Sequence, residues 1–130
     1  MINILSRKIL KIANLQVFLH EEIASKGELS STSGSAGVEA VAGWGHKPTA
    51  DKARRKAKVI GKPYFALEDG FLRSVALGCE GAEPLSLSVD PVGVYYDATR
   101  PSQLEEWLND WESWMTPELE ERARHAVRRL

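Results

Sequence analysis

Residues 38–48 read VEAVAGWGHKP, and residues 63–74 read PYFALEDGFLRS. Each stretch is an apolar run that ends in polar residues flanked by glycine. Between them, apolar residues recur at helical spacing from residue 49 to residue 60. A strand, a helix and a strand joined by short loops form the βαβ unit of a parallel sheet. The sequence therefore predicts an α/β fold built on a parallel sheet.

Polar side chains follow both predicted strands at the point where each strand ends. The first strand, 38–42, leads into residues 43–47, and the second, 64–67, leads into residues 68–70. In parallel sheets, ligands bind at the carboxyl ends of the strands. We therefore expect the functional site at this edge.

The first polar segment combines two glycines with a histidine and a lysine. Gly43 and Gly45 allow a sharp turn or a close approach to a ligand. Pro48 disfavours helical geometry at the residue before it, and Thr49 is the expected N-cap. The free N–H groups at the helix start, with His46 and Lys47 beside them, suit an anion. The Gly-x-Gly pattern lacks both the dinucleotide fingerprint and the phosphate loop, so a tight turn with a solvated lysine is an equal alternative, and a nucleotide-binding regulatory domain has no other support.

The second polar segment places two carboxylates side by side. Neighbouring residues of an extended chain point to opposite faces, so only one of Glu68 and Asp69 faces a given cleft if the strand continues. The other can orient Arg73 or cap the next segment. Adjacent acids at a strand end are also common turn formers, so a structural role remains open.

Bulk properties exclude several functional classes. The chain has 130 residues and a net charge of −1, which fits one domain and gives no global field for nucleic acid. The single Cys79 excludes an intrachain disulfide and fits a reducing compartment. The sequence has no apolar stretch of about 20 residues and no secretory signal. Its three histidines show no metal-ligand spacing.

The flanking segments predict further elements. Residues 2–5 read as a strand, and residues 30–37 as a loop. We expect a helix between Asn14 and Gly27, two short strands or a hairpin at 85–89 and 93–96, and two C-terminal helices starting near Ser102 and Thr116. Apolar residues at helical spacing are expected to face the core: Leu15, Phe18, Leu19 and Ile23 in the first helix, and Leu104, Trp107, Leu108 and Trp111 in the helix near Ser102.

The basic segment between the two strands has two interpretations. Lys52, Arg54, Arg55, Lys56 and Lys58 make it strongly cationic. A solvated outer helix face is the simpler interpretation, and a patch for anionic lipid headgroups is the sharper one.

Four sequence motifs resemble those of a known protein family. These are GWGHKPTA at 43–50, LEDGFLRS at 67–74, PLSL at 84–87 and YYDATRPS at 95–102. They closely resemble the capsular polysaccharide biosynthesis/export proteins of Gram-negative bacteria, a family of retaining β-Kdo glycosyltransferases. The resemblance runs from about residue 2 to the end and implies a partial N-terminal domain of GT-B type, with a Rossmann-like sheet. Since the family carries two transferase modules, and few strands precede the last residue, we expect residues 1–130 to be one partial domain, the front of the first module, and inactive in isolation.

The resemblance also implies substrates and partners. The donor would be CMP-Kdo and the acceptor a lipid-linked Kdo, with no metal or other cofactor, for a linker that serves capsular polysaccharide synthesis and transport. We expect a cytoplasmic protein with peripheral contact to the inner membrane and to capsule assembly proteins. The alternative is a non-catalytic fragment of that machinery that binds lipid or a protein partner.

The resemblance to the family motifs implies roles for particular residues. Retention implies a carboxylate nucleophile, for which Asp69 is the candidate, with Glu68 as base or orienter. The resemblance gives substrate binding to the residues around them: Gly43, Gly45, His46, Lys47 and Arg73. Asp97 and Arg100 are expected to pair with each other in the cleft wall. We further expect His46, the two carboxylates and Arg73 to line a single hollow.

Overall fold

The computed structural model describes residues 1–20, 23–24, 37–74 and 82–129. Its elements, in chain order, are β1 Ile2–Ile4, the 3-10 helix η1 Ile9–Lys11, α1 Leu15–Leu19, β2 Ile23–Ala24, β3 Ala40–Trp44, α2 Pro48–Ile60, β4 Tyr64–Asp69, β5 Leu87–Asp90, α3 Gln103–Asn109, α4 Trp111–Trp114 and α5 Pro117–Val127.

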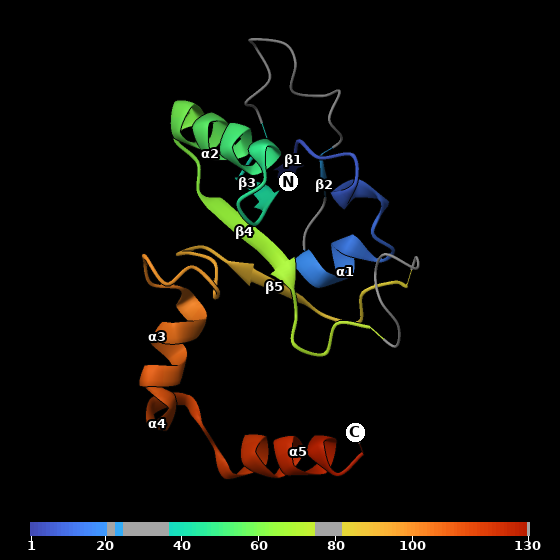
Figure 1. The fold of residues 1–130 in the computed structure, drawn as a ribbon, viewed down its shortest axis with the longest axis vertical. Helices are drawn as coiled ribbons and strands as arrows, with labels where there is room; N and C mark the ends of the chain where they lie inside the picture. The colour runs from blue at the N-terminus through green and yellow to red at the C-terminus, as the bar shows by residue number, and fades with distance from the viewer. Residues whose placement is uncertain (21–22, 25–36, 75–81, 130) are drawn as a thin grey trace.

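A mixed sheet forms the body of the molecule (Figure 1). Its strand order is β2-β1-β3-β4-β5. The β1–β2, β1–β3 and β3–β4 pairs are parallel, and β5 runs antiparallel to β4. The prediction of an α/β fold on a parallel sheet is confirmed, with β5 as the antiparallel exception.

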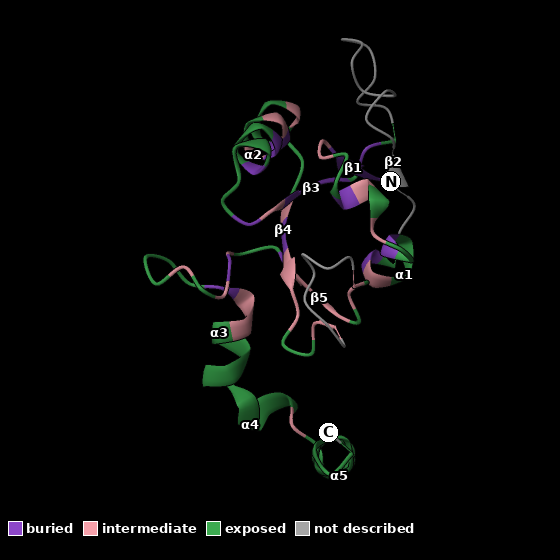
Figure 2. Cartoon of the chain, turned by 45° about the vertical axis from the view of Figure 1, so that its right-hand side comes forward, coloured by how far each residue is buried: buried purple, intermediate pink, exposed green. Residues whose placement is uncertain are grey.

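Two apolar layers cover the two faces of this sheet. On one face, α2 packs Ala53 and Ala57 against Val41. On the other face, Ile9 of η1 and Leu15 of α1 pack against Leu67. Figure 2 shows buried residues concentrated along β1, β3 and the inner side of α2, which is the pattern of a sheet covered on both faces.

The helix between the two motif strands forms largely as predicted. Ala50, Ala53 and Ala57 are its buried residues, and Gly61 ends it in a left-handed conformation. The predicted N-cap is wrong by two residues. Lys47 is the cap, because Pro48 holds it extended and itself occupies the first helical turn.

Both motif strands run two residues further than predicted. β3 extends through Gly43 and Trp44, and β4 extends through Glu68 and Asp69. The reason lies in the pairing: β4 is bonded to β3 on one side and to β5 on the other, so the ladder continues past the apolar run.

Other expectations are corrected near the ends of the chain. The first helix ends at Leu19, because His20 adopts the left-handed conformation and Ile23 pairs with β1 instead. Gly27, Cys79 and the predicted loop 30–37 lie outside the described residues, apart from Gly37. Residues 93–96 form no strand, and residues 95 and 96 lie in a turn. The two C-terminal helices begin with the caps Ser102 and Thr116, as expected.

The apolar stripe expected in the core is exposed. Trp107, Leu108 and Trp111 are at least half exposed, at 54%, 59% and 50%. α3 and α4 lead away from the sheet, and α5 lies beyond them (Figures 1 and 2). Helical spacing alone did not reveal whether another layer faces this stripe.

Candidate functional site

The predicted site residues lie at the carboxyl edge of the parallel strands. β3 ends at Trp44 and is followed by Gly45 to Lys47, while β4 ends at Asp69. The backbone N–H of Gly45 donates to the carbonyl of Leu67 at 3.0 Å. This bond ties the loop after β3 to β4, so the two polar segments meet as the sequence predicts.

Glu68 is held by a tyrosine and backed by a glycine. The Tyr96 hydroxyl donates to Glu68 Oε2 at 3.0 Å. A Cβ on Gly45 would lie 2.5 Å from that hydroxyl and 2.7 Å from Glu68 Oε2, and Gly45 has a φ of +48°. The positive φ favours glycine, and a larger residue would also have to displace the ends of the Tyr96 and Glu68 side chains. Partial burial, and then the hydrogen bond to Glu68, raises the pKa of Tyr96, which keeps the phenol protonated as a donor.

His46 belongs to the same group of side chains. Its Nε2 lies 3.2 Å from Asp97 Oδ2, and its ring meets Tyr96 edge to face at 5.9 Å. The expected ion pair between Asp97 and Arg100 is present at 3.6 Å. Hydrogen bonds from Thr99, above all from its hydroxyl, lower the pKa of Asp97. We call His46, Glu68, Tyr96 and Asp97 the His46 cluster.

Asp69 sits in a different environment. Arg73 Nε lies 2.8 Å from Asp69 Oδ2. The other carboxylate oxygen, Oδ1, is buried and has no hydrogen-bond partner. The Tyr95 hydroxyl donates to the Asp69 carbonyl at 3.3 Å. Asp69 therefore has its charge partner on one oxygen, while its other oxygen is buried without a partner among the described residues.

The expectation of a single hollow is wrong. Because β4 continues through Asp69, Glu68 points to the face covered by α2 and Asp69 to the face covered by η1. His46 lines a hollow of about 200 Å³ with Asp97, while Lys47 and Arg73 line one of about 820 Å³ with Trp44. The edge therefore carries two separate hollows, and neither Glu68 nor Asp69 is among the described residues that line them.

The two predicted glycines differ in what surrounds them. Gly45 lies against the His46 cluster, as described above. Gly43 is buried in β3, where a Cβ would lie 2.9 Å from Ala50 Cα and 2.8 Å from the Tyr64 hydroxyl. The contacts of Gly43 are thus with α2 and β4, and its predicted role in substrate binding stays a prediction.

Sequence reasoning gave no role to Tyr95 and Tyr96. Both contact the predicted carboxylates, Tyr95 at the Asp69 carbonyl and Tyr96 at the Glu68 side chain. The sequence feature that could have indicated a role is their position in the YYDATRPS motif, directly before Asp97. The chain bends at 91–92 shortly before them, where Asp90 Oδ1 accepts from the Val92 and Gly93 N–H groups.

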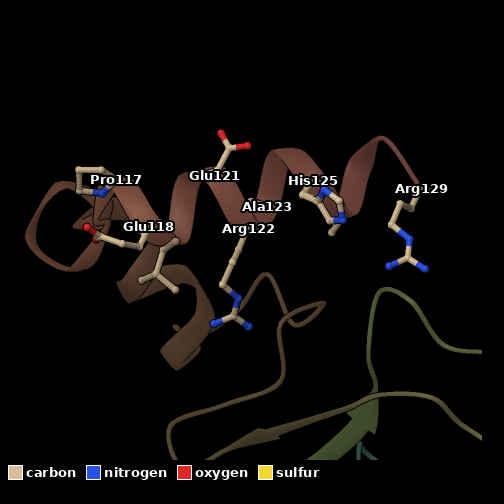
Figure 3. Close-up of a pocket in the computed structure, with 9 residues that line it drawn as sticks. Pro117, Glu118, Glu121, Arg122, Ala123, His125 and Arg129 are labelled. Atoms are coloured by element: carbon tan, nitrogen blue, oxygen red, sulfur yellow. The ribbon is translucent and has the colours of Figure 1, made fainter.

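A larger hollow lies along α5, far from these residues. It measures about 1030 Å³ and is lined by residues of α5 and its C-terminal flank. Figure 3 shows Glu118, Arg122 and His125 along this single helix, and the described residues that line the hollow all lie within 117–129. None of the predicted site residues lines it, so we assign no site there.

Clustered metal ligands and membrane-spanning helices are both absent from the described residues. In the described part of the chain, no group of three or more His, Cys, Asp or Glu side chains is placed to hold a metal ion. Within the same residues, no helix combines the length and apolar character needed to cross a membrane.

The fold and the site define an α/β protein with paired carboxylates and basic side chains at the strand ends. Residues 39–129 match the family described as capsule polysaccharide biosynthesis protein, which covers more than half of the chain. The chain belongs to this family, and the predicted resemblance is confirmed.

Curated relatives are capsule and lipopolysaccharide proteins. The capsule polysaccharide modification protein LipA of Neisseria meningitidis serogroup A is 47% identical over 104 residues, which is 79% of this chain and 14% of that protein. The lipopolysaccharide-processing protein LpsZ of Rhizobium meliloti is 46% identical over 65 residues, or 50% of this chain and 15% of that protein. The chain thus spans about one seventh of the length of these relatives.

Two solved structures from Thermosulfurimonas dismutans share the fold. The KpsC β-Kdo 2,4 transferase has a TM-score of 0.83 and 53% identity, covering 98% of this chain and 38% of that chain. The KpsC β-Kdo 2,7 transferase has a TM-score of 0.58 and 26% identity, covering 98% of this chain and 40% of that chain. Both comparisons relate this chain to glycosyltransferases.

Proposed function

We propose that this chain forms the front portion of a retaining β-Kdo transferase that makes a 2,4 linkage in the Kdo linker of a capsular polysaccharide. The observation that carries the proposal is the match to the 2,4 transferase, with 53% identity and a TM-score of 0.83, against 26% and 0.58 for the 2,7 transferase. The donor would be CMP-Kdo and the acceptor a lipid-linked Kdo. A lipid-linked acceptor would locate the transfer reaction at a membrane surface.

Asp69 is the nucleophile in this proposal. Its carboxylate would attack the anomeric carbon of Kdo while the bond to the CMP phosphate breaks and CMP leaves with the electron pair. The acceptor hydroxyl would then displace Asp69, lose its proton to a base and leave the configuration retained after two inversions. The ion pair with Arg73 supports this role because it holds the Asp69 carboxylate in place at the end of β4.

Glu68 is better suited to orienting than to attack. It faces the opposite side of β4 from Asp69, and its Oε2 is engaged by Tyr96. Together with Gly45 and His46 it fixes the loop after β3. Lys47 and Arg73, which share a hollow, would meet the carboxylate of a sugar acid, a group for which an arginine fork is well shaped.

A chimera tests the proposal. This chain replaces the matched segment of the Thermosulfurimonas dismutans 2,4 transferase, and Kdo transfer from CMP-Kdo is measured, with circular dichroism to verify folding. We expect transfer by the chimera, a loss of about a thousandfold or more in Asp69→Asn, and no more than about a tenfold loss in Glu68→Gln.

Each variant has an outcome that counts against its assignment. Full activity in Asp69→Asn removes the nucleophile, and a loss of about 10²-fold or more in Glu68→Gln makes Glu68 a base. A folded chimera without transfer overturns the function and favours the alternative, a lipid- or partner-binding module.

A further inference from the structure

Three neighbouring strands end in basic side chains on the same face of the sheet. Arg7 and Lys8 follow β1, Lys47 follows β3, and Arg73 follows β4. These strands are adjacent in the order β1-β3-β4. All four side chains line the hollow of about 820 Å³ on the η1 face, which we call the basic hollow.

The positive charge of the basic hollow is largely uncompensated. Among the described residues that line it, none is acidic. Asp69 pairs with Arg73, but within the described ranges Arg7, Lys8 and Lys47 have no ion pair. Lys47 instead lies over the Trp44 ring at 5.6 Å. Basic groups gathered without counter-charges repel one another, and a bound anion relieves that repulsion.

The other residues that line the basic hollow suit an anionic group that belongs to a larger molecule. Ser6 and Thr49 supply hydroxyl groups, and Leu5, Ile9, Ile12 and Trp44 supply an apolar side. α2 begins at this wall, so its positive dipole end adds to the field of the side chains. The volume falls within the usual range for small-molecule sites, about 300–1,000 Å³.

We propose that the basic hollow binds an oxyanion of the acceptor substrate, next to the apolar or sugar portion that carries it. Only the identification of the ligand as the acceptor substrate rests on the proposed function. The oxyanion has two possible sources, the phosphate that joins the acceptor to its lipid and the carboxylate of a Kdo residue. Arg7, Lys8, Ser6 and Thr49 thereby gain a binding role that the sequence motifs did not indicate.

A titration followed by ¹H–¹⁵N NMR tests this proposal on the whole 130-residue chain. The probes are inorganic phosphate, glycerol 3-phosphate and free Kdo, each added at constant ionic strength. We expect saturable shifts at the amides of residues 6–9, 47, 49 and 73. Shifts with the phosphate probes alone assign the lipid phosphate, shifts with Kdo alone assign the sugar carboxylate, and shifts with both assign a general oxyanion site.

Two double variants, each of which removes two positive charges, distinguish binding at the basic hollow from a general effect of lost charge. Arg7→Ala with Lys8→Ala should raise the Kd at least about tenfold. Lys52→Ala with Lys58→Ala, on the outer face of α2, should leave it unchanged. No saturable shift with any probe, or equal weakening in both variants, overturns the proposal. Binding needs no transfer, so an inactive chimera with intact binding refutes the proposed function and leaves this inference standing.

Discussion

At the residue scale, a shift of one position along β4 decides which face of the sheet each carboxylate reaches. Glu68 and Asp69 are adjacent in sequence but point to opposite faces of β4. Their partners differ accordingly, a tyrosine hydroxyl for Glu68 and a guanidinium for Asp69. The alternation was predictable from sequence, but the partners were not, because Tyr96 arrives from a turn 28 residues away.

Asp97 gives a prediction of pH dependence. Its pKa is lowered from the ordinary value of 3.8, chiefly by hydrogen bonds from Thr99. A carboxylate with a lowered folded-state pKa stabilises the fold above its unfolded pKa and loses that contribution as the pH falls through the folded value. We therefore expect the free energy of unfolding to fall less between pH 5 and pH 3 in Asp97→Asn than in the wild type.

Urea unfolding at several pH values measures this difference. Glu112→Gln, at an exposed position on α4, is the control and should follow the wild-type curve. An Asp97→Asn curve as steep as that of the wild type would show that other carboxylates cause the acid sensitivity.

At the scale of elements, the close contact between β3 and α2 holds the site loop. The helix approaches through alanines, and its nearest backbone atom is 2.9 Å from the position that a Cβ on Gly43 would take. The loop of Gly45 to Lys47 joins these two elements, and Arg54 of α2 donates to the Gly45 carbonyl at 2.6 Å. Any shift of α2 therefore moves His46 and Lys47.

Gly43→Ala tests this packing. The added methyl group must displace α2 or the Tyr64 hydroxyl, since a helix backbone atom cannot give way cheaply. We expect a loss of about 1–3 kcal/mol in the free energy of unfolding, measured by urea titration. Gly61→Asn at the other end of α2 is the matched control, because asparagine tolerates the left-handed cap and nothing lies near that position. Equal stability of Gly43→Ala and the wild type would mean that the contact is looser than described.

At the scale of the whole molecule, α5 lies apart from the sheet (Figure 1). α5 is exposed at every described residue and has no buried side chain (Figure 2). Its stability comes from its own caps and pairs, such as Thr116 at the N-terminus and Glu120 with Arg124.

Removal of residues 116–130 is therefore expected to leave the thermal midpoint of the sheet nearly unchanged, within about 2–4 °C. The far-UV circular dichroism signal for helix should decrease. Leu67→Ala is the positive control, because this fully buried β4 side chain should cost about 2–5 kcal/mol. A large drop in the midpoint of the shortened chain would show that α5 supports the sheet.

Local patterns were sufficient where neighbours in sequence are also neighbours in space. The sequence by itself determined the βαβ core, the helix between the motif strands, the caps at Ser102 and Thr116, and the meeting of both polar segments at one edge. Each of these depends on the 3.6-residue or two-residue period, or on a local hydrogen bond.

Only the tertiary structure decided the rest. Ile23 left the predicted helix because a strand partner, β1, was available. The predicted core stripe at Trp107 to Trp111 is exposed because no described layer covers it. β4 continued through Asp69 because strands pair with it on both sides, and that extension turned Glu68 and Asp69 to opposite faces of the sheet. Pairing and burial across distant segments depend on which surfaces meet, and a local period carries no information about that.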